Sequence, residues 1–258
     1  VFGDVNSTAA CALAAVKLNI PVVHVEAGLR SFDRSMPEEI NRIVTDALSR
    51  VLLVSEPSGV ENLKREGVDE GKIHLVGNVM MDTLAHELPK AKESHIRDRL
   101  DLKPGEAYAL VTLHRPANVD DPAVIKPLLE CLAGFSKRLP MVFPVHPRTQ
   151  KIIDECGFQS LFEAHPAFKC VSPLPYRDNL CLMSGAKVVL TDSGGMQEET
   201  TFLKVPCLTL RNNTERPITV EMGTSRLVGN DPEKVRLGLE DVMQGRWPKG
   251  KDIPLWDG

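Results

Sequence analysis

Paired cysteines are missing from this chain, and so is any histidine pattern typical of metal ligands. The six cysteines lie at positions 11, 131, 156, 170, 181 and 207, and the closest two are 11 positions apart. No Cys-x-x-Cys pair is therefore present to hold zinc or to act as a redox-active dithiol, and we interpret the cysteines as reduced, partly buried thiols of a cytoplasmic protein. We expect no metal site.

A basic surface and a long apolar run are also missing. Lys and Arg total 31 against 35 Asp and Glu, a formal net charge of −4, which argues against nucleic acid as a partner. The longest apolar run has eight residues, 9–16, whereas a membrane-spanning helix needs about 20. Neither a G-x-G-x-x-G fingerprint nor a P-loop occurs, and we expect no cofactor and no membrane contact.

The composition that remains is that of a globular protein. Of 258 residues 42% are apolar, enough for one large or two small domains without disulfides. Short runs rich in Val, Ile and Leu alternate with helical patterns, and continuous apolar runs are typical of parallel strands covered on both faces. We predict strands over 21–25, 51–54, 72–76, 107–113, 141–145, 169–171, 187–190 and 207–210. The fold class is therefore α/β, in two open layers.

Helical segments divide the chain into parts. The clearest helix is expected over 37–49, because Pro37 begins it and apolar residues from Ile40 to Leu48 recur at helical spacing. A polar helical stretch over 80–100 follows Gly77-Asn78, so we predict one domain part over 1–78 and a second domain over 79–258. Val1-Phe2 resembles the end of a strand, and we expect the chain to be incomplete.

In open parallel sheets ligands bind beyond the carboxyl ends of the strands, and one strand end here suits an anion. The sequence 187–199 predicts a strand, a Ser193-Gly194-Gly195 turn and a helix. Two glycines let backbone N–H groups approach a phosphate closely, and the new helix adds unpaired donors. Glu199, one turn into the helix, is placed to accept hydrogen bonds from ribose hydroxyls. The alternative is an ordinary turn in which Ser193 caps the helix.

Acidic residues follow two strand ends near the start of the chain. Asp4 follows Val1-Phe2 and is either a catalytic carboxylate or, like Asn6, only a turn or cap residue. Glu26 follows the strand at 21–25 and reaches the same edge of the sheet. A carboxylate there is costly unless it is paired, so Glu26 belongs either to a site or to a salt bridge with Arg30.

Glu38, at the start of the helix over 37–49, is the third candidate carboxylate. Ser35-x-x-Glu38 is also a capping box, and acidic residues are favourable at a helix N-terminus in any case. The spacing leaves both interpretations open.

Basic residues follow two strand ends in the second half. His114 and Arg115 come after the strand at 107–113, and His146 and Arg148 come after the strand at 141–145. Arg side chains bind phosphates through paired hydrogen bonds, so this edge, with Arg216, suits phosphate groups. Carboxylates in one half and a phosphate cradle in the other predict a nucleotide-linked substrate, with proton transfer on one side and leaving-group stabilisation on the other.

At these residues the chain resembles the non-hydrolysing UDP-N-acetylglucosamine 2-epimerases, a family with two Rossmann-like domains and a glycosyltransferase-B-like fold. The matching segments are 3–8, 24–30, 36–42, 76–78, 113–119, 190–199 and 210–217. The resemblance implies an isomerase that reversibly converts UDP-N-acetylglucosamine to UDP-N-acetylmannosamine, through elimination and re-addition of UDP, for surface polysaccharides. It also implies a homodimer and an incomplete first domain here, with about 90 residues expected before Asp4.

The resemblance further implies roles for single residues. Asp4, Glu26 and Glu38 match the acid/base positions of the family, and His114 matches the histidine that contacts the departing phosphate. Ser193, Gly194 and Glu199 match the diphosphate and ribose contacts, with Arg216 nearby. Residues 175–180 match a loop that faces the uracil. Pro116-Ala117 stands where many relatives carry Arg-Glu, a departure from the family pattern. Two alternatives remain: a UDP-sugar glycosyltransferase, and a UDP-binding fragment without turnover.

Overall fold

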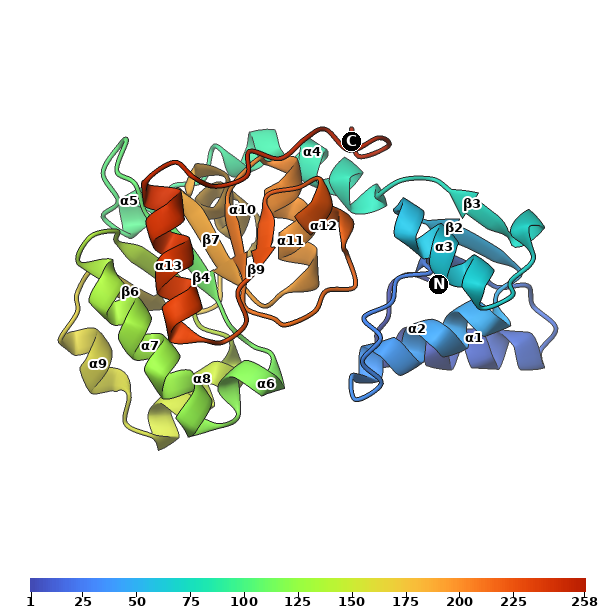
Figure 1. Cartoon of the computed structure of the whole chain (residues 1–258), viewed down its shortest axis with the longest axis horizontal. Helices are drawn as coiled ribbons and strands as arrows, with labels where there is room; N and C mark the ends of the chain where they lie inside the picture. The colour runs from blue at the N-terminus through green and yellow to red at the C-terminus, as the bar shows by residue number, and fades with distance from the viewer. The chain divides into compact units, whose positions relative to one another are not determined.

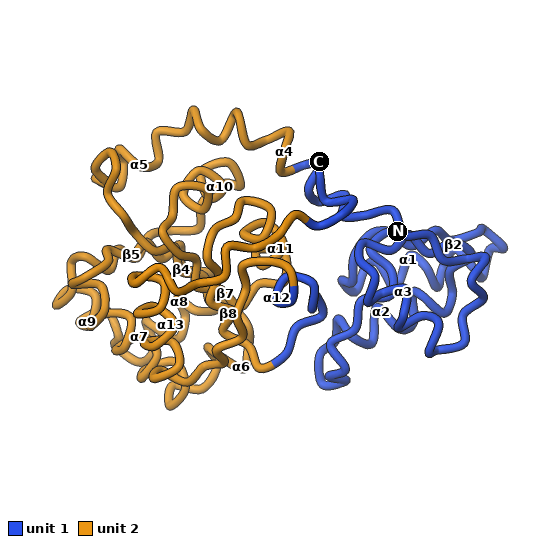
Figure 2. Tube along the Cα trace, turned by 45° about the horizontal axis from the view of Figure 1, so that its top comes forward, with its two compact units in different colours: residues 1–83, 213–221, 253–258 blue, residues 84–212, 222–252 orange.

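Two compact units make up the chain, and the computed structural model describes all of residues 1–258 (Figure 1). Unit 1 comprises 1–83, 213–221 and 253–258, and unit 2 comprises 84–212 and 222–252; Figure 2 colours them blue and orange. Two late segments of the chain therefore pack with the first unit. The two contiguous ranges expected from the sequence, 1–78 and 79–258, assign these two late segments to the second domain.

Unit 1 is built on a three-stranded parallel sheet with strand order β1-β2-β3. Its elements are α1 (Asn6–Lys17), β1 (Val23–Ala27), α2 (Pro37–Leu48), β2 (Val51–Val54), α3 (Pro57–Arg65), a 3-10 turn (Glu70–Lys72), β3 (Ile73–Leu75), the start of α4 (Val79–Ala91) and α12 (Ile218–Glu221). Phe2 pairs with Val25 in a parallel bridge beside β1. The bridge places Gly3 and Asp4 at the carboxyl end of the sheet.

Unit 2 is built on a six-stranded parallel sheet with strand order β6-β5-β4-β7-β8-β9. Its elements after α4 are α5 (Ile96–Arg99), β4 (Ala109–Thr112), α6 (Pro116–Val119), α7 (Pro122–Ser136), β5 (Met141–Pro144), α8 (Pro147–Glu155), α9 (Gln159–Glu163), β6 (Phe168–Val171), α10 (Tyr176–Gly185), β7 (Val188–Thr191), α11 (Gly194–Phe202), β8 (Cys207–Thr209), β9 (Ser225–Leu227) and α13 (Pro232–Met243). Separate apolar clusters cover the two faces: α7 and α13 contribute to one, α10 and α11 to the other. The strands are therefore buried on both sides, as their continuous apolar runs predict.

The predicted α/β fold class and all eight predicted strands are confirmed, with ends that shift by at most two residues. The short strand β9 was not predicted, since Ser225-Arg226-Leu227 carries no apolar run. The expected helical stretch over 80–100 is two helices, α4 and α5. No helix combines the length and apolar character that a bilayer crossing requires.

Helix α2 begins at Pro37 as expected, but it buries the opposite face from the one its apolar pattern suggests. Its buried residues are Glu39, Arg42, Thr45 and Asp46. Ile40 and Val44 are 37% and 38% exposed. The polar face is the buried one because Glu39, Arg42 and Asp46 pair with charged and backbone groups outside the helix.

Candidate functional site

Asp4 is held by an arginine from α2. The Arg42 side chain, 1% exposed, donates from Nη1 to Asp4 Oδ2 at 2.5 Å. Arg42 Nη2 donates to Glu39 Oε2 at 2.6 Å, and Glu39 also accepts the backbone N–H groups of Ser31 and Phe32. Burial acts to raise the pKa of Glu39, but the Ser31 amide and Arg42 outweigh it and keep that pKa below its usual value. Asp4 therefore faces a fixed positive charge and does not cap α1, whose N-cap is Val5.

Glu26 lies in a β-bulge at the end of β1. The pairing of β1 with β2 skips it, and its φ is +76°, a left-handed value that costs a non-glycine residue free energy. Its Oε1 accepts from Arg216 Nη2 at 2.7 Å. A Cβ on Gly3 would lie 3.5 Å from Glu26 Oε2, so Glu26 lies beside the Gly3-Asp4 turn. The bulge thus aims this carboxylate towards the strand end that carries Asp4, the kind of strain found at functional sites.

Glu38 lies in the first turn of α2, half-buried. It is four residues before Arg42, and residues four apart share a helix face. The face that carries Arg42 to Asp4 therefore also carries Glu38. The capping-box interpretation is wrong, because Met36 is the N-cap and the Ser35 hydroxyl donates to Asp33.

A buried network behind β1 holds this edge in place. Asp46 accepts from Arg30 Nη1 at 2.8 Å and from Gly28 N at 3.1 Å, and lies 2.6 Å from His24 Nδ1. Arg30 also donates twice to Glu66, at 2.8 Å each. The proposed salt bridge between Glu26 and Arg30 is therefore wrong. Arg30 forms ion pairs with Asp46 and Glu66, and Glu26 pairs with Arg216.

In unit 2 a buried aspartate holds His114. Asp192 follows β7, is 0% exposed, and lies 2.8 Å from His114 Nδ1. It also accepts the backbone N–H groups of His114 and Arg115 and the side-chain amide of Asn118. Burial opposes ionisation, but the His114 side chain and the backbone N–H groups of Arg115 and His114 lower the pKa of Asp192 below its usual value. An ionised Asp192 fixes His114 Nδ1 as the donor and turns the ring's Nε2 away from the carboxylate.

His146 follows β5 and lies near His114, with ring centroids 5.6 Å apart. Its Nδ1 accepts the Arg148 backbone N–H at the start of α8. The Arg148 side chain instead donates twice to exposed Asp120. Of the basic residues expected at this edge of the sheet, the structure thus brings together the two imidazoles and keeps Arg148 in a surface ion pair.

The Ser193-Gly194-Gly195 turn opens α11, as predicted. Ser193 is the N-cap of this helix, as the alternative interpretation states, but its side chain makes no cap hydrogen bond. A Cβ on Gly195 would meet no atom within 4 Å. Packing within the protein therefore does not require glycine there, whereas close approach of a ligand to the backbone would.

Glu199 is buried one turn further along α11, at 6% exposed, and accepts from Tyr176 Oη at 3.0 Å. Burial raises the pKa of Glu199 to about 7, although the Tyr176 hydroxyl acts in the other direction. Residues 175–180, expected as a loop, are the N-cap and first half of α10. Tyr176 therefore reaches Glu199 from a helix start.

Sequence reasoning missed Arg42, Asp46, Tyr176 and Asp192. Asp192 had a usable signal, because a carboxylate directly after a fully buried strand needs a partner, the argument applied above to Glu26. Arg42 and Asp46 had none, since a helix pattern does not show which polar residues face inward. Arg216, expected beside the phosphate cradle, packs with unit 1 and contacts Glu26.

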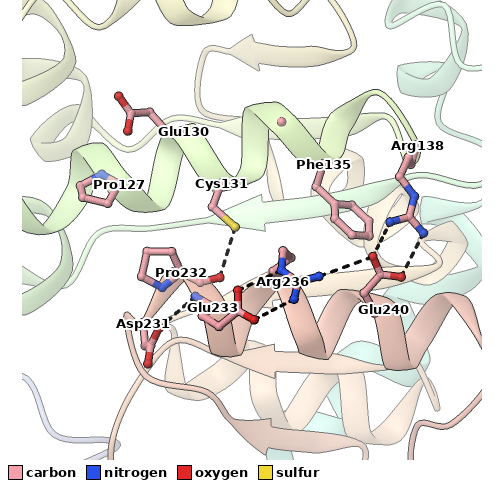
Figure 3. Close-up of a pocket in the computed structure, with 11 residues that line it drawn as sticks. Pro127, Glu130, Cys131, Phe135, Arg138, Asp231, Pro232, Glu233, Arg236 and Glu240 are labelled. Carbon is pink, nitrogen blue, oxygen red and sulfur yellow. Dashed lines mark hydrogen bonds and ion pairs between the residues drawn. The ribbon is translucent and has the colours of Figure 1, made fainter.

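A groove on unit 2 lies apart from these residues (Figure 3). It has a volume of about 690 Å³ and runs between α7 and α13, lined by Pro127, Cys131 and Phe135 among others. Four of its charged side chains pair with one another, Arg138 with Glu240 and Arg236 with Glu233. No candidate site residue lines it.

The family model described as UDP-N-acetylglucosamine 2-epimerase matches residues 1–258. The UDP-N-acetylglucosamine 2-epimerase of Methanococcus maripaludis is 40% identical over 262 residues, which cover 100% of this chain and 71% of that protein. A UDP-2,3-diacetamido-2,3-dideoxy-D-glucuronate 2-epimerase of Pseudomonas aeruginosa is also 40% identical, over 89% of this chain and 62% of that protein.

A solved structure agrees with this match. The crystal structure of Methanocaldococcus jannaschii UDP-GlcNAc 2-epimerase in complex with UDP-GlcNAc and UDP superposes with a TM-score of 0.89 at 41% identity, over 99% of this chain and 72% of that one. The structure from Neisseria meningitidis bound to UDP-GlcNAc gives 0.89 at 31% identity. The chain belongs to the UDP-N-acetylglucosamine 2-epimerase family.

Proposed function

We propose that the protein reversibly inverts C2 of UDP-N-acetylglucosamine, giving UDP-N-acetylmannosamine for surface polysaccharide precursors. The observation that supports this most directly is the family match over the whole chain, joined to a relative of 41% identity whose structure holds UDP-GlcNAc and UDP. The arrangement within each unit suits the reaction. Unit 1 carries ion-paired carboxylates, and unit 2 carries a carboxylate–imidazole pair and a Gly-Gly helix start.

The reaction divides into elimination and re-addition. A carboxylate removes the C2 proton, the electron pair forms the C1–C2 double bond, and the C1–O bond to UDP breaks to leave 2-acetamidoglucal and UDP. Re-addition returns a proton to the opposite face of C2 and UDP to C1. Because the two faces need separate acid/base groups, we assign proton transfer to Asp4, Glu26 and Glu38.

Unit 2 would hold the leaving group. His114, oriented by Asp192, and Arg115 would stabilise charge on the departing diphosphate, with His146 beside them. The backbone N–H groups at Ser193, Gly194 and Gly195 would bind phosphate oxygens, and Glu199 the ribose hydroxyls. Arg216, which contacts Glu26, belongs on the proton-transfer side. The proposal includes a cytoplasmic location and a homodimer. Light scattering would test the homodimer.

The decisive experiment is to incubate the protein with UDP-N-acetylglucosamine in deuterated water and follow deuterium entry at C2 by NMR. We expect entry together with UDP-N-acetylmannosamine, without any sugar acceptor, which a glycosyltransferase would not produce. Binding of UDP without deuterium entry would instead identify a UDP-binding fragment. UDP-2,3-diacetamido-2,3-dideoxy-D-glucuronate, run in parallel, tests the substrate of the Pseudomonas aeruginosa relative.

Asp4→Asn should slow deuterium entry by about 10² to 10⁴, because a general acid/base group contributes that much to rate. UDP affinity should stay within a few-fold, since the proposed UDP contacts lie in unit 2. Asp98→Asn, at an exposed carboxylate on α5, is the matched control and should change neither. Near-normal exchange in Asp4→Asn would remove the role assigned to Asp4.

A further inference from the structure

The two peptide groups on either side of the Asp4 Cα atom are held by side chains from other elements of unit 1. His24 Nε2, on β1, donates to Gly3 O at 2.9 Å, and Asn41 Nδ2, on α2, donates to Asp4 O at 2.9 Å. Gly3 has a φ of +69°, so the chain turns at this point. The proposed reaction uses neither His24 nor Asn41, yet both contact the backbone that carries Asp4.

His24 joins the Gly3 carbonyl to α2 through a buried ring. Its side chain is 0% exposed, and its Nδ1 lies 2.6 Å from Asp46 Oδ1. Asp46 also accepts from Arg30 Nη1 at 2.8 Å and from Gly28 N at 3.1 Å, so the carboxylate behind the ring is itself fixed. A carbonyl oxygen only accepts hydrogen bonds, so Nε2 is the donor to Gly3. The position of the Gly3 carbonyl therefore depends on a ring that is held on both sides.

Asn41 makes two contacts with the turn from one amide group. Besides Asp4 O, its Nδ2 donates to Asn6 Oδ1 at 3.0 Å. The next residue of α2, Arg42, donates from Nη1 to the Asp4 carboxylate. Two adjacent residues of one helix thus hold the backbone and the side chain of Asp4.

We propose that His24 and Asn41 are positioning residues for Asp4. Because a peptide group is planar, only the torsions φ and ψ are free at each residue, and holding the peptide groups on both sides fixes both torsions. The direction of the Asp4 Cβ follows, and with it the place at which the carboxylate meets Arg42. A displacement of about 1 Å at a reacting group can cost 10²-fold in rate. The catalytic consequence rests on the proposed function, whereas the restraint on the turn does not.

The restraint is testable without turnover, by amide hydrogen exchange. The Gly3 N–H donates to Val25 O at 3.2 Å and reports opening of the turn, while the Val76 N–H, which donates to Val54 O at 2.9 Å, is a reference in the same unit. In Asn41→Ala the Gly3 amide should exchange about 2- to 10-fold faster, the ratio expected for the loss of one hydrogen bond. The Val76 rate should not change.

Variants of the same elements supply the controls. Ser49→Ala removes a hydrogen bond within α2, from the Ser49 hydroxyl to Thr45 O, and should leave the Gly3 rate unchanged. His24→Leu should accelerate Gly3 exchange, whereas His24→Gln keeps an N–H donor of similar reach and should stay closer to the wild type. A wild-type Gly3 rate in Asn41→Ala, an equal acceleration in Ser49→Ala, or equal rates in the two His24 variants would overturn the proposal.

Turnover supplies the second readout. In Asn41→Ala we expect kcat for C2 exchange to fall about 10- to 100-fold with KM within two-fold, because the proposed UDP contacts lie in unit 2. In an Asp4→Asn background the same substitution should cost less than two-fold, since Asn41 acts only through Asp4. An equal loss in both backgrounds would contradict the positioning role. If the wild-type protein exchanges no C2 proton, the proposed function fails and the amide exchange still decides the restraint.

Discussion

The two units both contain a parallel sheet, but they differ in the side chains that they bury. The apolar cluster beside the sheet of unit 1 has four fully buried members, Ala27, Leu52, Val54 and Leu63. Unit 1 also buries several charged side chains, among them Arg30, Arg42, Glu39, Asp46 and Glu56. Unit 2 has two large apolar clusters, one on each face of its sheet. Apolar burial is non-directional, whereas ion pairs specify distance and angle, so unit 1 holds its carboxylates by directional contacts and unit 2 supplies a densely packed platform.

The chain has two tryptophans, and each reports on one unit. Trp247 lies in unit 2, where its Nε1 donates to Thr224 O, and Trp256 lies in unit 1, where its Nε1 donates to Ser55 O. Trp247→Phe leaves a probe of unit 1, and Trp256→Phe leaves a probe of unit 2. Denaturant unfolding followed by fluorescence then measures each unit's free energy of unfolding.

The largest expected effect is in unit 1. Asp46→Ala removes the shared acceptor of His24, Gly28 and Arg30, and breaking a buried ion pair from one side costs about 3–5 kcal/mol. The Trp256 transition should move by that amount and the Trp247 transition should stay. Glu61→Ala, which breaks an exposed pair with Arg65, should cost less than about 1 kcal/mol. Equal costs for the two variants would contradict the idea that charge holds unit 1.

The counterpart in unit 2 is a core truncation. Leu110 is 0% exposed in β4, a central strand, and Leu110→Ala should cost about 2–5 kcal/mol through lost burial and a cavity. Only the Trp247 transition should move. Leu237→Ala, on the 49% exposed side chain of α13, is the control and should be nearly neutral. A tolerated Leu110→Ala would show that unit 2 does not depend on its apolar core.

A pH-dependent effect comes next. Because the folded-state pKa of Glu199 is raised to about 7, the folded protein keeps a proton that the unfolded chain loses above pH ~4.5, so stability falls as pH rises from there to 7. Glu199→Gln cannot ionise and should be more stable than wild type at pH 8 by on the order of 2–3 kcal/mol. The difference should vanish near pH 4. Glu130→Gln, at an exposed carboxylate of α7, should show no such trend.

The smallest effect concerns backbone strain in unit 1. At position 26 the left-handed φ favours glycine, so Glu26→Gly should be more stable than Glu26→Ala by about 1 kcal/mol. At Glu38, in a helix, the order should reverse, with alanine favoured by about 1 kcal/mol. Comparing the two pairs by Trp256 fluorescence isolates strain from the loss of the carboxylate. The same order at both positions would refute strain at Glu26.

The strands and the edge that carries the candidate site could be predicted because they depend on local pattern. Continuous apolar runs located the strands, and the residues after them, such as Glu26 and His114, lie at the carboxyl ends as expected. Helix α2 shows where local pattern misleads. Its apolar stripe predicts a buried face, but the polar face is buried because Arg42 and Asp46 find charged partners outside the helix.

The sequence by itself determined the α/β class, the parallel strands and the residue types at their ends, since burial and helical spacing act over a few neighbouring residues. Only the tertiary structure decided which charges meet. Glu26 pairs with Arg216, 190 positions away, and not with Arg30, four positions away. The partner of a buried charge depends on distance in the folded chain and on the free-energy cost of leaving the charge unpaired. Neither quantity can be predicted from the neighbouring residues in the sequence.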